Sequence, residues 1–315
     1  MNAPALNSGT PLDRARIDRQ SPGPEPVDTN LYVFEPLSFL PVLSERFPWL
    51  EQLFKRVGIH PTQPENPVNP YTGQQEAEGF TNIGEHCLAV AYCAEKVGLA
   101  LLSAGIIDND TLDLIIQRSL VHDLSKPYEI MRRKACEAGL TSDVYSVAAY
   151  EKLAPLLEEL GVPKSLAEYL TNAGSETGHN SLAGFLRCDK KEITGLVADR
   201  LPDKVIHLAD DMTWTGNPRT GRPTSAFFTC WERMLVSGFP EKYPFLWKEG
   251  LVLTASGEIQ PTSDINKIPK GQHLLGHYTH IQVLVANLIC QELQQLLDPG
   301  SDEKPEFFVK RLVRS

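Results

Sequence analysis

The stretch "RSLVHDLSKPYE", residues 118–129, places a histidine and an aspartate side by side where an apolar run ends. That run, residues 109–123, begins with Asn and Asp as N-cap candidates and carries apolar residues at helical spacing. Shortly beyond it, Pro127 fits the first turn of a second helix. His122 and Asp123 are therefore predicted at a junction between two helices.

The junction matters because neighbours on a regular helix point about 100° apart, so both reach one ion only at a helix end or distortion. Two other polar residues interrupt apolar helical segments, His86 and Asp210. Singly, such residues are often hydrogen-bonded core histidines or helix caps. Together, two imidazoles and two carboxylates form a ligand set for a divalent ion, Mn, Fe, Co, Ni, Zn or Mg, and buried charge without a partner is costly.

Most of the chain reads as helices joined by short connections rich in Gly and Pro. Short helices are predicted within residues 37–58, and longer ones over 85–105, 109–123, 125–139, 142–161, 163–174, 190–200, 202–214, 226–238 and 271–297. No segment before Trp214 shows sustained strand alternation, and a small β-hairpin is predicted over residues 251–261. The predicted fold class is mainly all-α, a helical bundle.

Four parts are predicted along the 315 residues. Residues 1–30 read as a disordered tail, and residues 31–80 as a helical cap with a Pro-rich loop. Residues 81–215 carry the candidate metal ligands. Residues 216–315 form a mostly helical extension that could cover the pocket and set substrate choice, or form a homo-oligomer interface.

Composition narrows the class of partner. The net charge of −10 argues against long nucleic acid as a partner, because phosphate-dominated binding needs a basic surface. No apolar segment of about 18 residues runs without interruption, so no membrane partner is expected. The six cysteines form no C-x-x-C pair and are expected to be reduced thiols of a cytoplasmic protein.

The order His86, His122-Asp123, Asp210, with the run "HDLSKP", resembles the HD-domain superfamily of metal-dependent phosphohydrolases. The resemblance covers about residues 80–215, and a serine stands where many members have glycine. It implies a helical bundle with these four residues as ligands of a central metal. It also implies hydrolysis of a small phosphorylated substrate, with a nucleotide as the leading candidate.

Lys126 could reach a phosphate oxygen, or could only neutralise Asp123. Members with two metal ions generally carry two more histidines before the last aspartate, and here the candidates are His179 and His207. His207 shares a helix face with Asp210, but it lies closer to that aspartate than is usual, which favours one metal. His179 could then be a general acid or a phosphate contact, or a simple loop residue.

The C-terminal part adds two further sets of candidates. His273, His277 and His280 share one face of a predicted helix and favour a polar or substrate-lining surface over a second metal site. Arg219 and Arg222 could clamp a phosphate, or lie in a solvated loop.

Two other functions remain open. Some HD-domain proteins resemble di-iron oxygenases, which would require both extra histidines as ligands. A non-catalytic module that binds a ligand or partner is the third reading, although burying two carboxylates without a metal would be costly.

Overall fold

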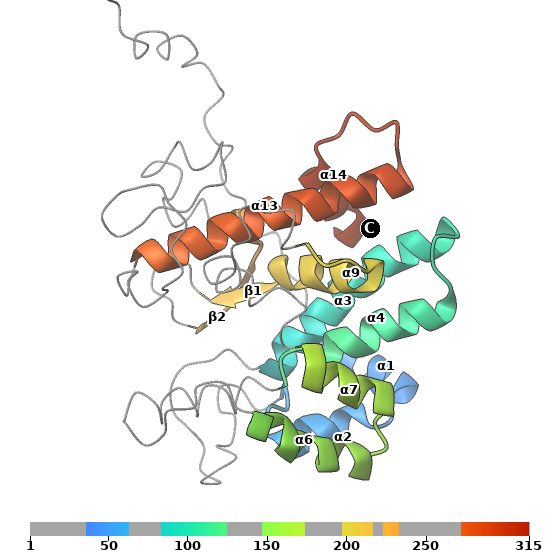
Figure 1. Cartoon of the computed structure of the whole chain (residues 1–315), viewed down its shortest axis with the longest axis vertical. Coiled ribbons are helices and arrows are strands. Elements are labelled where there is room, and N and C mark those ends of the chain that lie inside the picture. The colour runs from blue at the N-terminus through green and yellow to red at the C-terminus, as the bar shows by residue number, and fades with distance from the viewer. Residues whose placement is uncertain are drawn as a thin grey trace, which may run out of the picture. The chain divides into compact units, whose positions relative to one another are not determined.

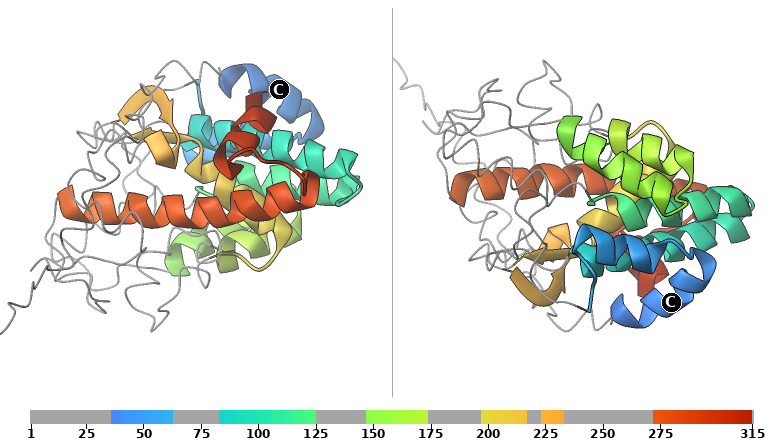
Figure 2. Two further views of the ribbon diagram at one scale, coloured as in Figure 1. Left: turned by 90° about the horizontal axis from the view of Figure 1, so that it is seen from above. Right: turned by 90° about the horizontal axis from the view of Figure 1, so that it is seen from below.

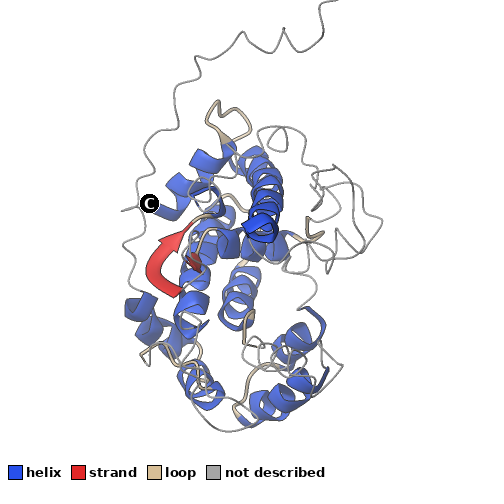
Figure 3. Ribbon diagram, turned by 90° about the vertical axis from the view of Figure 1, so that its left-hand side faces the viewer, coloured by secondary structure: helices blue, strands red, loops and turns tan. Residues whose placement is uncertain are grey.

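The described part of the chain is mainly helical (Figure 3). The computed structural model describes residues 36–62, 83–124, 147–173, 197–216, 223–232 and 272–314. Its long helices are α1 (Pro36–Arg46), α2 (Leu50–Val57), α3 (Ile83–Ser103), α4 (Asn109–Val121), α6 (Val147–Glu159), α7 (Lys164–Ala173), α9 (Leu201–Asp211), α13 (Gln272–Leu297) and α14 (Pro305–Arg314). For these residues the predicted mainly all-α class is confirmed.

Helix α3 lies among helices from the N-terminal, central and C-terminal parts of the described chain. It packs on α1, α4, α9 and α14 (Figure 1). At Gly98 an added Cβ would lie 2.5 Å from Cδ1 of Leu112 in α4, so this glycine permits the α3–α4 contact. By length and composition α3 could also cross a membrane, but most of it is buried among other helices, as in a core helix.

Two apolar clusters meet at α3. The first core combines α3 with α9, α13 and α14, and includes Val90, Val97, Val205, Leu208, Met212, Val285, Ile289 and Val309. The second core combines α3 with α1, α2, α4, α6 and α7, and includes Leu43, Leu53, Leu88, Ile116, Leu120, Leu153 and Leu166. α3 therefore fixes α4 and α9, which belong mainly to different cores, beside each other.

The ends of α4 and α9 are defined locally. α4 starts at the cap Asp108, whose Oδ1 accepts the backbone N–H of Thr111 at 2.8 Å. It ends at Val121, and the next two residues, His122 and Asp123, lie in a turn. α9 starts with a proline in its first turn and ends at Asp211.

The two C-terminal helices, α13 (Gln272–Leu297) and α14 (Pro305–Arg314), pack against the helices that carry the site. α13 packs on α9, and α14 folds back against α13 and α3 (Figure 2). After α9, strand β1 (Trp214–Gly216) pairs antiparallel with β2 (Pro223–Phe228), with Trp214 opposite Phe228. The next helical turn opens with a capping box, in which Thr229 N–H donates to Glu232 Oε2 at 2.8 Å and Glu232 N–H to Thr229 Oγ1 at 3.2 Å.

Several sequence-based boundaries need correction. The helix predicted over 226–238 begins only at Cys230, because residues 226–228 pair as a strand with β1. The helix predicted over 190–200 does not include residues 197–200, which lead into α9. α14 was not predicted. The predicted tail over 1–30, the helix over 125–139 and the hairpin over 251–261 lie outside the described residues.

Candidate metal centre

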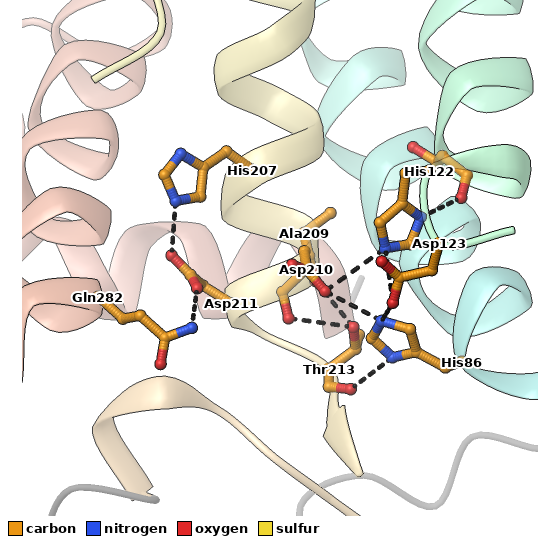
Figure 4. A network of polar contacts seen from close by, with 10 residues as sticks. His86, His122, Asp123, His207, Ala209, Asp210, Asp211, Thr213 and Gln282 are labelled. Atoms are coloured by element: carbon orange, nitrogen blue, oxygen red, sulfur yellow. Dashed lines mark hydrogen bonds and ion pairs between the residues drawn. The ribbon is translucent and has the colours of Figure 1, made fainter. Parts of the chain in front are cut away.

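Four side chains converge from three helices (Figure 4). His86 comes from the first turns of α3, His122 and Asp123 from the turn that ends α4, and Asp210 from the last turn of α9. Their side chains are buried, with exposed fractions from 1% to 10%. The end of α4 meets the geometric need noted from sequence, since a turn lets two adjacent residues face one point.

The atoms that face each other are two imidazole nitrogens and two carboxylate oxygens. Nε2 of His86 lies 3.0 Å from Asp210 Oδ1 and 3.4 Å from Asp123 Oδ2. Nε2 of His122 lies 3.5 Å and 3.7 Å from the same two oxygens. Ligand atoms from His86, His122 and Asp123 all lie within 4.8 Å of one another, so this buried group could hold a metal ion.

Backbone carbonyls orient both imidazole rings. Nδ1 of His122 lies 2.6 Å from the carbonyl oxygen of Ser119, and Nδ1 of His86 lies 3.2 Å from that of Thr213. Nδ1–H must be the donor in both contacts, because a carbonyl oxygen only accepts. In a neutral ring this leaves the Nε2 lone pair directed at the carboxylates, which is how outer partners prepare a histidine for a metal.

The distances fit shared ligation better than direct hydrogen bonds at His122. Its Nε2 is buried and has no hydrogen-bond partner among the described residues. Two ligands about 2.1 Å from one ion lie about 3.0 Å apart in adjacent octahedral positions and about 3.4 Å apart in a tetrahedron. Three of the four N–O distances, 3.0, 3.4 and 3.5 Å, are close to such edges, and the fourth, 3.7 Å, is longer. His86, His122 and Asp123 therefore could hold a divalent ion, and Asp210 Oδ1 lies within 3.5 Å of both imidazoles.

Electrostatics also favour a cation at this point. α4 and α9 both direct their C-terminal ends here, where the helix dipole is negative, and two carboxylates add to that potential. Burial alone would lower the pKa of His86, but hydrogen bonds with Asp123 and Asp210 raise that pKa above its usual value. For His122, the charge of Asp123 likewise overcomes burial and raises the pKa well above normal.

His207 turns away from this cluster. Its Nε2 lies 3.4 Å from Oδ2 of Asp211, on the other side of α9 (Figure 4). The predicted face shared with Asp210 therefore does not bring its ring to the two other imidazoles. On a helix a side chain at i can meet i+4 as readily as i+3, so the spacing to Asp210 did not by itself decide where the ring lies.

The other predicted site residues cannot be placed beside the cluster. Lys126, His179, Arg219 and Arg222 lie outside the described residues. The three C-terminal histidines lie in the first half of α13, and only their helical backbone is described: His273, His277 and His280.

Three contributors to the site were missed from sequence. The carbonyls of Ser119 and Thr213 gave no signal, because every residue carries one. Gln282, which reaches Asp211 beside the cluster, could have been noticed as a polar residue within the apolar run of α13.

Comparisons of the chain with protein-family models, with curated proteins and with solved structures find no match.

Proposed function

We propose that this chain is an HD-type, metal-dependent phosphohydrolase that acts on a small phosphorylated molecule, with nucleotides as the leading candidates. One observation carries the proposal. Two buried Nε2 atoms, each oriented by a backbone carbonyl at its Nδ1, face two carboxylates at the negative ends of two helices. The order of these four residues along the chain, which resembles the HD superfamily, supports the same function.

His86, His122, Asp123 and Asp210 would hold the ion. A divalent ion bound there would lower the pKa of a coordinated water molecule and neutralise charge on a phosphoryl group. The two carboxylates would balance the charge of such an ion, so additional cationic groups are needed to attract a phosphate. Lys126, Arg219 and Arg222 are the residues we assign to that task, with His179 as a candidate general acid.

One metal per chain is the form we favour. The oxygenase alternative needs two further histidines as ligands, and His207 faces Asp211 instead of the cluster. The ligand set also favours an active metal site over a module that binds without metal, since burying both carboxylates beside helix C-termini would otherwise be unfavourable.

Metal content measured by elemental analysis tests the proposal first. Protein purified without chelator is expected to contain about one transition metal per chain, and the His122→Ala/Asp123→Ala double variant is expected to contain none. Asp108→Asn is the matched control, because it alters a carboxylate at the other end of α4 and should leave the metal in place. Circular dichroism checks that all three proteins are folded.

Phosphate release from nucleotides and simple phosphate esters, assayed with the identified metal, tests the reaction. We expect release by the wild type and by Asp108→Asn, and a loss of at least about 100-fold in the double variant. Two irons per chain with oxygen consumption would favour the oxygenase. Absence of bound metal, even after incubation with Mn, Fe, Ni or Zn, would overturn the proposal and favour a binding module.

A further inference from the structure

A second buried polar network lies on α9 next to the candidate metal centre. Asp211 follows Asp210 directly and is 1% exposed. Its Oδ1 accepts a hydrogen bond from Nε2 of Gln282 in α13 at 2.9 Å, and its Oδ2 lies 3.4 Å from Nε2 of His207. In Figure 4 this network and the four candidate ligands lie on opposite sides of α9.

Joining α9 to α13 through this network has a cost in free energy, because it buries the carboxylate of Asp211. Asp211 lies at the negative end of α9, and the residues around it in sequence and in α13, such as Met212 and Val283, belong to the first core. Apolar side chains at this contact would join the helices without burying a charge. A directional hydrogen bond, by contrast, fixes how the end of α9 is rotated about its axis.

That rotation determines the position of two parts of the site. Adjacent residues on a helix are about 100° apart, so holding Asp211 toward α13 directs Asp210 toward α3 and α4. Two residues later, the Thr213 carbonyl accepts from His86 Nδ1 at 3.2 Å. The Thr213 hydroxyl donates to the carbonyl of Ala209 at 3.0 Å, which ties this segment to the last turn of the helix.

We propose that Asp211 is a positioning residue for the metal centre, which acts through Gln282 and His207 to hold the end of α9. Asp210 then reaches the ion, and the Thr213 carbonyl orients His86. The inference rests on the metal site of the proposed function but not on its phosphohydrolase reaction. It also makes metal affinity dependent on the position of α13.

Titration of the full-length protein with Co(II), followed by visible absorption, tests this role. We expect Asp211→Asn and Gln282→Leu each to weaken Co(II) binding by about 10- to 100-fold, as loss of an outer partner does, and to change the Co(II) spectrum. The exchanged pair, Asp211→Asn with Gln282→Glu, keeps the shapes and total charge and restores an amide–carboxylate hydrogen bond. It should recover much of the affinity.

Glu292→Gln provides the matched control. It weakens the Lys204–Glu292 ion pair, 2.5 Å long, which also joins α9 to α13 but near the opposite end of α9. This variant should keep the wild-type Co(II) affinity and spectrum even if its melting temperature falls. Gln282→Leu keeps the test decisive if Asp211→Asn does not fold.

The outcomes separate the two claims. If the wild type binds Co(II) but Asp211→Asn and Gln282→Leu bind it equally well, the positioning role is wrong and the metal site stands. If the exchanged pair recovers nothing while folding normally, the role is also wrong. If the wild type binds no Co(II), the metal site itself fails and the inference falls with it.

Discussion

His60 is a single buried residue that should make stability depend on pH. It lies just after α2, which ends at Val57 and is capped by Gly58 in the left-handed conformation, and it is 5% exposed. Its Nδ1 lies 2.6 Å from the hydroxyl oxygen of Thr62. Burial lowers the pKa of His60, the charge of Lys55 lowers it further, and Glu51 opposes them only in part. The fold therefore favours the neutral ring.

The expected pH dependence follows from that direction. An unfolded histidine titrates near pH 6.5, so the preference for neutral His60 stabilises fully above about that pH. As the pH falls below 6.5, His60 binds a proton more readily in the unfolded chain than in the folded protein, because its pKa is lower in the folded protein. The free energy of unfolding therefore decreases. We expect urea unfolding to show a smaller loss between about pH 7.5 and about pH 5.5 in His60→Asn than in the wild type.

The comparison isolates His60, because the other histidines are the same in both proteins. Equal losses of unfolding free energy in the wild type and in His60→Asn would show that this ring does not contribute. A larger loss in the variant would reverse the direction assigned to the pKa.

Between elements, the contact of α3 with α4 depends on Gly98. Glycine within a helix costs about 0.5–1 kcal/mol relative to alanine, so its use here indicates a need for space. A Cβ added at Gly98 would come too close to Cδ1 of Leu112. The Leu112 methyl group is at the end of a flexible side chain, however, and can move aside for a single added carbon. A branched side chain demands more room. We expect Gly98→Val to lower the unfolding free energy by about 1–3 kcal/mol.

Leu99→Val is the control for this prediction, because Leu99 is the next residue of α3 and is 42% exposed. It measures the cost of a β-branched residue in the same helix without new packing. Denaturant unfolding that showed the same small loss for both variants would mean that α4 moves aside without strain.

The elements also differ in how far the sequence predicts them. α3, α4 and α9 were predicted to within three residues at each end, because long apolar periods and helix caps act locally. β2 was missed because residues 226–228 are apolar and precede a true helix, so nothing local separates strand from helix. Its pairing with β1 is a contact between separate segments of the chain, which local pattern does not contain.

The site shows the same division. His86 and His122 stand out in sequence because imidazoles seldom interrupt apolar helices without a reason. Whether the His207 ring lies beside Asp210 or Asp211 depends on which helix packs on each side of α9. That packing is a tertiary property, which local sequence does not contain. The positions of Lys126, His179, Arg219 and Arg222 stay predictions.

For the whole molecule, the candidate metal site lies where the two cores are joined. Asp210 comes from α9, whose buried apolar residues belong to the first core, while His122 and Asp123 follow α4, most of whose buried apolar residues belong to the second. His86 comes from α3, which contributes to both cores. An ion held by these residues would therefore link the two cores as well as form an active site.

Metal removal should consequently lower the stability of the entire fold. An ion that binds only the folded protein, present at about 100 times its Kd, adds about 2.7 kcal/mol. For a chain of 315 residues that corresponds to a rise of about 4 °C in Tm. We expect calorimetry to show this rise when metal is returned to chelator-treated wild type, and no rise in His86→Ala/Asp210→Ala. An equal rise in that variant would place the stabilising ion elsewhere, whereas no rise in the wild type would mean that the ion does not join the two cores.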